Sequence, residues 1–134
     1  MFQKVDYNSL NARQKENYNF QKIAGELADF GFNCLRLNDD WQGADFLAVH
    51  VDGKKFLKVQ VKGRFSVDKK YLRKDIYIAF LQGAKCYLYP HDDVLNKILA
   101  RGAIGNTRSW EENGVYNWPS LPKWASDLLS EYEI

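Results

Sequence analysis

The sequence predicts an α/β fold in which a mixed central sheet is flanked by helices, within one domain over residues 1–134. Apolar side chains recur at helical spacing near the N-terminus, and five short apolar runs typical of strands follow them. The 134 residues, of which 46% are hydrophobic, are sufficient to bury one substantial core. The order of these segments, a helix, three strands, two strands and a helix, is typical of one α/β domain.

The first element is a helix expected over Leu10–Phe30. Its apolar residues recur at helical spacing and predict one buried stripe, made of Phe20, Ile23, Ala24, Leu27 and Phe30. Ser9 is the expected N-cap, because its hydroxyl can accept a hydrogen bond from a free N–H of the first turn. Gly31 is expected to end the helix in the left-handed conformation.

Five strands are expected after this helix, each marked by apolar or β-branched residues and bounded by turn residues. Their ranges are Asn33–Leu37, Asp45–Val51, Lys55–Phe65, Ile76–Phe80 and Cys86–Tyr89. Asp39, Asp40 and Trp41 are expected to form a loop, in which Trp41 either stacks on a base or anchors the loop. Asp52 and Gly53 predict a two-residue hairpin turn between the second and third strands.

The rest of the chain is expected to hold a helix, a long loop and a short terminal helix. Asp92 or Asp93 is expected to cap a helix that ends near Ala100. Glycine and proline residues make 101–122 mostly loop, and a last helix is expected from Lys123 to about Tyr132. Residues 106–134 form an aromatic-rich tail that packs either on the core or on a partner subunit.

The hairpin turn also predicts which residues lie opposite one another. If Asp52 and Gly53 are the two loop residues, Asp45 lies opposite Gln60, and Lys62 and Lys58 point to the same face as Gln60. A carboxylate and an amide oxygen suit Mg²⁺ or Mn²⁺, and an ammonium group nearby can orient water and offset charge on a phosphate. The alternative is a solvent-facing polar strand face, and a one-residue slip in register would break the arrangement.

The segments Gly43-Ala44-Asp45-Phe46 and Val59-Gln60-Val61-Lys62 resemble the two halves of the PD-(D/E)XK nuclease signature. In that superfamily an acidic residue opens the second core strand, and a D/E-X-K tripeptide lies on the third strand. The resemblance spans about residues 10–65. It implies a restriction-endonuclease-like αβββαβ-type core, a metal held by Asp45 and Gln60, and a Lys62 that positions water or stabilises the transition state.

This chain departs from the family pattern at two positions. Gln60 stands where the family usually has an acid, a feature similar to Mrr-type and intron homing endonuclease members, and it leaves more of the metal affinity to Asp45. The family often adds a glutamate from the preceding helix. Here Gln21 stands near that position and Glu16 lies one turn before Phe20, so either residue is a candidate for the site.

Positive charge is concentrated in one short stretch of a nearly neutral chain. Net charge is +2 overall, but residues 54–74 hold nine basic residues and one acidic residue, a net charge of +8. Such a stretch favours a polyanion-binding surface, and the alternative is a solvated edge strand protected by lysine. The resemblance implies that its basic residues contact DNA phosphates, namely Lys58, Arg64, Lys69, Lys70, Arg73 and Lys74.

Other features limit the location and function of the protein. Cys34 and Cys86 are far apart in sequence and predict reduced core thiols in a cytoplasmic protein. With two histidines a zinc site is not expected, and neither a membrane span nor a secretion signal is expected.

Three functions are therefore weighed. The leading prediction is a Mg²⁺- or Mn²⁺-dependent DNA endonuclease that forms a homodimer if its substrate is double-stranded. The second is an inactive nuclease-fold module that binds nucleic acid or protein. The third is a protein-interaction partner, such as an immunity or antitoxin-like protein, with the aromatic tail as its interface.

Overall fold

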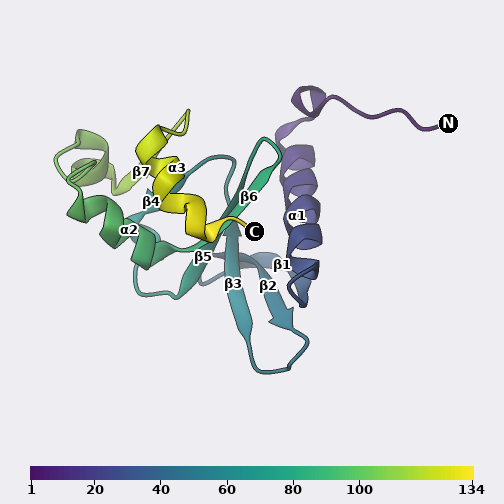
Figure 1. The fold of residues 1–134 in the computed structure, drawn as a ribbon. Coiled ribbons are helices and arrows are strands. Elements are labelled where there is room, and N and C mark those ends of the chain that lie inside the picture. Colours follow the sequence, from purple (N-terminus) through teal and green to yellow (C-terminus); the bar gives the residue numbers. More distant parts are fainter.

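A five-stranded mixed sheet of order β1-β2-β3-β5-β6 forms the centre of the computed structural model, which describes residues 1–134 (Figure 1). The first three strands pair antiparallel, β3 pairs parallel with β5, and β6 returns antiparallel. The strands are β1 Phe32–Trp41, β2 Ala44–His50, β3 Phe56–Val61, β5 Ile76–Gln82 and β6 Lys85–Pro90. The expected mixed α/β class is confirmed.

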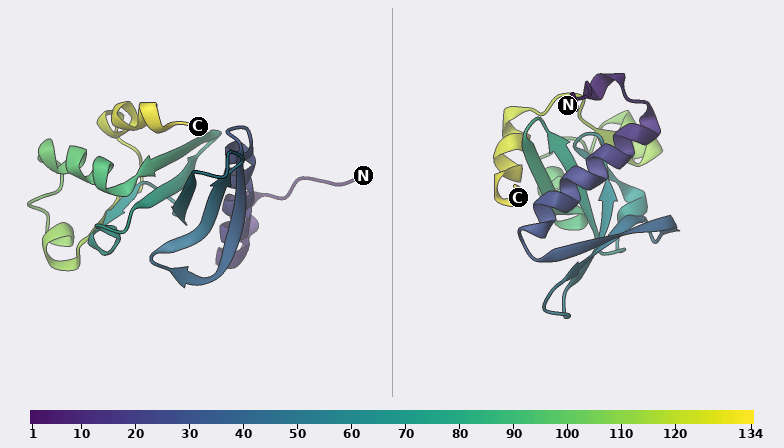
Figure 2. Two further views of the ribbon diagram at one scale, coloured as in Figure 1. Left: turned by 90° about the horizontal axis from the view of Figure 1, so that it is seen from below. Right: turned by 90° about the vertical axis from the view of Figure 1, so that its right-hand side faces the viewer.

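Helices cover both faces of this sheet (Figure 2). The longest, α1 (Ala12–Ala28), packs on one face, and α2 (His91–Ala100) and α3 (Lys123–Leu129) lie on the other. A second, two-stranded sheet joins β4 (Ser66–Asp68) to β7 (Val115–Asn117). Short helical turns complete the chain at Tyr7–Ser9, Lys69–Tyr71, Ser109–Asn113 and Ser130–Tyr132. No helix has the length and apolar character needed to cross a membrane.

The start of α1 differs from the expectation. Asn11, and not Ser9, is the N-cap, because its side chain accepts from the Gln14 N–H while the Gln14 side chain accepts from the Asn11 N–H. This reciprocal capping box satisfies two free donors at once, whereas Ser9 belongs to the preceding helical turn. Gly31 has the expected positive φ of 84°, and a Cβ there would lie 3.0 Å from His50 Nε2.

The β2–β3 hairpin has the expected register but a different turn. Phe46 lies opposite Val59, and the same register continues to a His50–Lys55 pair in which the His50 N–H donates to the Lys55 carbonyl at 2.9 Å. The loop is therefore four residues long, because Asp52 Oδ1 accepts from the Lys54 N–H at 2.8 Å and folds the chain before the expected turn closes. Adding one residue on each side leaves the register unchanged.

The first strand is longer than the sequence pattern predicts. Residues 39–41, expected as a loop, form the end of β1, which has an irregular register between Arg36 and Trp41. Gln42 and Gly43 make the turn, both with positive φ, and Asp40 Oδ1 accepts from the Gly43 N–H at 2.7 Å. The run of Asn and Asp in this part of the strand is the reason the pattern ended early, because these residues are depleted in strands.

The connection from β3 to β5 contains β4 and a helical turn in place of the α-helix implied by an αβββαβ-type core. The partner of β4 is β7, which lies within the region 101–122 that was expected to be mostly loop. Strands of three residues carry too little periodicity to be recognised, and this pair also joins segments far apart in sequence.

The beginning of α2 and the C-terminal segment also refine the expectation. Asp92 and Asp93 lie in the first turn of α2 and do not cap it, because the helix starts at His91 after Pro90. Instead, Asp92 Oδ2 accepts from the Arg73 N–H at 2.9 Å. In the C-terminal segment, Trp110 and Trp118 are buried in the larger of the two hydrophobic clusters of the chain.

Candidate active site

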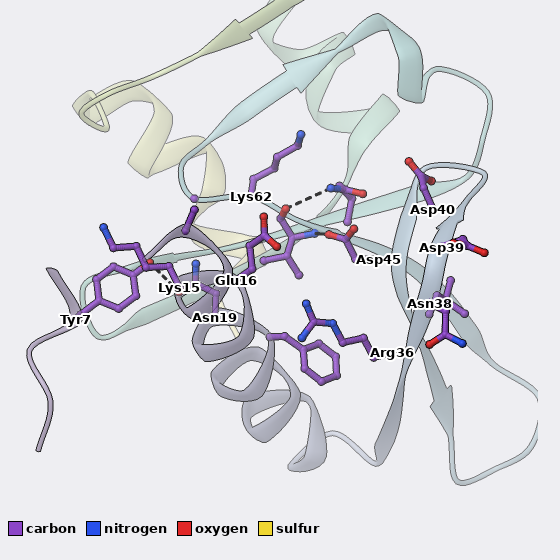
Figure 3. Close-up of a pocket in the computed structure, with 16 residues that line it drawn as sticks. Tyr7, Lys15, Glu16, Asn19, Arg36, Asn38, Asp39, Asp40, Asp45 and Lys62 are labelled. Atoms are coloured by element: carbon purple, nitrogen blue, oxygen red, sulfur yellow. Dashed lines mark hydrogen bonds between the residues drawn. The ribbon is translucent and has the colours of Figure 1, made fainter. Parts of the chain in front are cut away.

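A polar cavity of about 610 Å³ opens between the first turns of α1 and the ends of β1, β2 and β3 (Figure 3). Asp45 lies near the start of β2 and Gln60 near the end of β3, so the antiparallel register brings them to the same end of the hairpin. The lining residues are Tyr7, Ala12, Lys15, Glu16, Asn19, Phe20, Arg36, Leu37, Asn38, Asp39, Asp40, Asp45, Gln60, Val61, Lys62 and Gly63.

Asp45 is half-buried and fixed by the neighbouring strand. Its Oδ2 accepts from the Val61 N–H at 2.9 Å, and no hydrogen bond within the chain engages Oδ1. Burial raises the pKa of Asp45 above its usual value, although the Val61 N–H and the Lys62 charge oppose this shift. Asp40 and Glu16 raise the pKa further through like-charge repulsion. The carboxylate is thus held in place with one oxygen available for a ligand.

Lys62 is half-buried on the other side of the cavity. Its backbone N–H donates to the Ala79 carbonyl at 2.9 Å, and its Nζ lies 5.2 Å from the centroid of the Tyr71 ring. Burial, followed by repulsion from Lys70, lowers the pKa of Lys62, while Asp68, Asp45 and Asp40 act in the opposite direction. An amine with a lowered pKa gives up a proton more readily, which suits exchange of a proton with water.

The two faces of β3 divide as the hairpin register predicted. Gln60 lines the cavity. Its side chain makes one hydrogen bond, from Nε2 to the neighbouring Val61 carbonyl at 3.4 Å, and none to another strand or helix. Val59 is fully buried on the opposite face, and Leu57 and Val61 pack against the same hydrophobic cluster as α1. Packing of the apolar face therefore fixes the direction in which Gln60 and Lys62 point.

The two candidate helix residues lie on different faces of α1. Glu16 lines the cavity and is close enough to raise the pKa of Asp45. Gln21 is exposed and borders a separate cavity together with Gln14 and Lys22. Five residues correspond to about 140° of rotation around a helix, so the two side chains cannot share one face. The structure brings Glu16, and not Gln21, to the site.

None of the six basic residues expected to contact phosphates lines the cavity. Lys58 Nζ donates to Gln42 Oε1 at 3.2 Å, Lys69 lies over the Trp110 ring, and Lys70 lies 3.8 Å from Asp68. Arg64, Arg73 and Lys74 are exposed. Lys70 has an electrostatic effect on the site, because its charge lowers the pKa of Lys62.

Sequence reasoning missed several cavity residues, most importantly Lys15 and Arg36. Lys15 lies directly before Glu16 on the first turns of α1. The Arg36 guanidinium lies 5.3 Å from the centroid of the Phe20 ring and donates to Asn17 Oδ1. The sequence held a signal for Arg36. Side chains two residues apart on a strand point to the same face, so Arg36 was expected on the same face of β1 as Cys34. Tyr7, Asn19 and Asn38 were also missed.

The donor set fits a divalent cation of a particular kind. Asp45 offers a free carboxylate oxygen and Gln60 an amide oxygen, but no group of three His, Cys, Asp or Glu side chains is placed to enclose an ion. Mg²⁺ commonly binds through one or two carboxylates and keeps water or substrate oxygens as its other ligands. The residues therefore suit a cation completed by water and phosphate, and do not form an all-protein cage.

Comparison with known proteins found similarity to solved structures only. No protein-family model matches the chain, and no curated protein matches it. A Holliday junction resolvase from Archaeoglobus fulgidus is similar, with a TM-score of 0.48 and 18% identity over 58% of this chain and 74% of the other. A bacterial homing endonuclease gives a TM-score of 0.47 and 21% identity over 63% and 69% of the two chains. Both are nucleases, and the likeness concerns the fold alone.

Proposed function

We propose that the protein is an endonuclease that hydrolyses DNA phosphodiester bonds with Mg²⁺ or Mn²⁺. One observation carries this proposal. The β2–β3 register places a fixed carboxylate, an amide and a half-buried amine in one polar cavity, and the two charged groups have pKa values shifted toward their neutral forms. Such opposed shifts in a cleft are typical of catalytic sites.

Each site residue has a role that follows from its position. Asp45 and Gln60 would hold the cation, which would polarise a phosphate oxygen and lower the pKa of a bound water. Lys62 would orient the attacking water and exchange a proton with it, as its lowered pKa allows. Glu16, on the opposite wall of the cavity, is exposed and able to orient a second water molecule.

The proposal is tested by incubating plasmid and branched DNA with the protein and Mg²⁺ or Mn²⁺. Lys62→Met is expected to reduce the cleavage rate by about 10²-fold or more, because it removes the proton-exchanging group. Asp45→Asn is expected to abolish metal-dependent cleavage. Lys55→Met is the matched control, since Lys55 is exposed at the end of the hairpin loop, directly before β3 and away from the cavity. Equal cleavage by the wild-type protein and Lys62→Met would refute the mechanism.

A second candidate function is a nucleic-acid-binding module without catalysis. It is favoured by the neutral Gln60 in place of the family's acid and by the lack of a three-ligand cluster of acidic, His or Cys side chains. This function predicts DNA binding that weakens steeply with salt, and no cleavage with any divalent cation. An electrophoretic assay with and without metal separates the two functions.

Two further features belong to the same proposal. Cleavage of both strands of a duplex needs two sites, so we propose that the protein acts as a homodimer on double-stranded DNA. A cytoplasmic location is supported by Cys34 and Cys86, which are both free, with Cys86 buried. The six basic residues predicted to contact phosphates would then flank the site and add affinity and salt dependence without sequence choice, namely Lys58, Arg64, Lys69, Lys70, Arg73 and Lys74.

A further inference from the structure

Two more cavities continue from the candidate active site along α1. The nearer one, of about 290 Å³, shares Tyr7, Asn19 and Gly63 with the active-site cavity and ends at Tyr18. The farther one, of about 550 Å³, also borders Tyr18 and reaches Lys22. Because neighbouring cavities share wall residues, the three lie in series. We call the nearer and farther cavities together the α1 groove.

Tyrosine rings and lysines lie close together along α1, from the active-site cavity into this groove. Tyr7 and Tyr18 meet edge to face with ring centroids 5.1 Å apart. Lys15 Nζ lies 5.4 Å from the centroid of the Tyr7 ring, and Lys22 Nζ lies 5.5 Å from that of Tyr18. Lys15, Tyr18 and Lys22 follow one another at i, i+3 and i+7, so they occupy one face of α1. Tyr18 remains 39% exposed, which leaves its ring accessible to a ligand.

The charged residues of the groove differ from those of the active-site cavity. Four carboxylates line the active-site cavity, namely Glu16, Asp39, Asp40 and Asp45, and three basic side chains line it with them, namely Lys15, Arg36 and Lys62. No carboxylate lines either cavity of the α1 groove, whose charged wall residues are Lys4 and Lys22. The groove is therefore complementary to a polyanion, whereas the carboxylates needed to hold a cation lie in the active-site cavity.

We propose that the α1 groove binds an unpaired DNA strand and leads it into the cleavage site. Lysines beside a groove neutralise phosphates, and accessible tyrosine rings stack on bases. Bases inside a duplex are stacked on one another and cannot reach the rings, so the groove selects an unpaired segment, such as a flap or an overhang. This inference rests on the proposed function for its direction toward the active site and names the substrate class of that site.

The Tyr7 hydroxyl explains how the entrance to the groove is fixed. It donates to Asn19 Oδ1 at 3.2 Å, and Asn19 lines both the active-site cavity and the nearer groove cavity. This hydrogen bond ties the N-terminal helical turn to α1 at the junction of the two cavities. A strand in the groove would pass this junction before its phosphate reaches Asp45.

Binding is tested by fluorescence anisotropy of the full chain with two probes, a labelled oligothymidylate and a labelled blunt duplex. Tyr18→Ala is expected to weaken oligothymidylate binding about 10-fold, the usual effect of losing one stacking residue. Lys22→Gln is expected to weaken it less and to reduce its salt dependence. Neither change is expected to alter duplex binding more than about 2-fold.

Control variants separate loss of stacking from loss of folding. Tyr18→Phe keeps the ring and is expected to retain binding, while Phe56→Ala removes an exposed aromatic from the distant hairpin and is expected to have no effect. Circular dichroism verifies that each variant is folded. If Tyr18→Ala and Lys22→Gln both bind oligothymidylate as tightly as the wild-type protein does, the inference is overturned.

Cleavage assays distinguish failure of this inference from failure of the proposed function. Wild-type protein is expected to cut a duplex with an unpaired arm faster than a blunt duplex, and Tyr18→Ala is expected to remove that preference. Binding that depends on Tyr18 without cleavage of any substrate would support the groove and contradict the endonuclease. Cleavage that depends on Lys62 but is indifferent to Tyr18 and to the arm would support the endonuclease and contradict the groove.

Discussion

Phe65, in the aromatic core, follows Lys62 of the candidate active site by three residues, yet the two regions differ in the kind of group that they bury. Phe65 is fully buried, stacks on Trp118 at 4.5 Å and meets Tyr89 edge to face at 5.6 Å. In the active site, Asp45 and Lys62 are half-buried, and burial disfavours the charged form of each. One region stabilises the fold, and the other gives up stability to keep charged groups in a cleft.

The connection between the two regions explains why they are adjacent. After Lys62, the chain turns to Phe65, whose carbonyl accepts from the Trp118 N–H at 3.0 Å. The backbone of Lys62 is itself held by the Ala79 carbonyl of β5. The segment that carries the amine is therefore anchored at both ends, which limits its movement while the side chain remains in the cavity.

The largest expected effect comes from breaking the aromatic core. Phe65→Ala is expected to lower the free energy of unfolding by about 3–5 kcal/mol, because the lost ring leaves a cavity among rigid neighbours. Urea denaturation followed by tryptophan fluorescence measures this change. Phe56→Ala is the matched control and is expected to change it by less than about 0.5 kcal/mol, since Phe56 is 58% exposed. Similar losses in the two variants would contradict the comparison.

A smaller effect is expected at His91, the first residue of α2. Its side chain bonds to the connection from β3 to β5 (residues 62–75), which we call the crossover. His91 is fully buried, its Nε2 accepts from the Asp68 N–H at 3.0 Å, and its Nδ1 lies 2.9 Å from Asp92 Oδ1. Asp92 in turn accepts from the Arg73 N–H. His91→Ala is expected to lower the free energy of unfolding by about 1–3 kcal/mol, because the Asp68 N–H loses its acceptor.

The same variant tests whether the crossover positions the active site. In sequence, Tyr71 lies between Asp68, which bonds to His91, and Arg73, which bonds to Asp92. The Tyr71 ring contacts both Lys62 and the turn at Gly43. Cleavage by His91→Ala is expected to fall even under conditions in which the protein is fully folded. Asn96→Ala, on the exposed side of α2, is the control and is expected to change neither stability nor cleavage. Unchanged cleavage by folded His91→Ala would show that the crossover does not position the site.

The part of the site that could be predicted from the sequence is the part determined locally. Asp52 and Gly53 indicated a turn, and the apolar alternation of β3 fixed which residues face the core. Together they placed Asp45 and Gln60 at one end of the hairpin. The prediction of register survived an incorrect turn length because the two extra loop residues come equally from the two strands, one from each.

The part that could not be predicted depends on contacts between distant segments. Lys15 reaches the cavity because of how α1 packs across the sheet, an arrangement that no local pattern encodes. The β4–β7 pair joins residues about fifty positions apart through strands too short to show alternation. The choice of Glu16 over Gln21 likewise required the rotation of α1 about its axis, which depends on packing of Ile23 and Leu27.

The smallest expected effect has the opposite sign and identifies a functional residue. Asp45→Asn is expected to raise the free energy of unfolding at about pH 7, by on the order of 0.5–1 kcal/mol, because it removes a half-buried charge and retains an acceptor for the Val61 N–H. A carboxyl whose pKa is raised by folding contributes most to stability below its unfolded pKa, and this contribution is lost as pH rises through the folded pKa. The gain in the variant is therefore expected to disappear near about pH 3, where Asp45 is protonated.

Urea denaturation at these two pH values, paired with the cleavage assay, completes the comparison. A residue kept for folding would destabilise the protein when replaced, as Phe65 is expected to do. Replacing a residue that is kept for chemistry at a cost to folding would stabilise the protein and abolish cleavage. Because Lys62 attracts the ionised Asp45, part of the gain is offset in Asp45→Asn, and the double variant with Lys62→Met is expected to recover it. A loss of stability in Asp45→Asn at both pH values would place Asp45 with the structural residues instead.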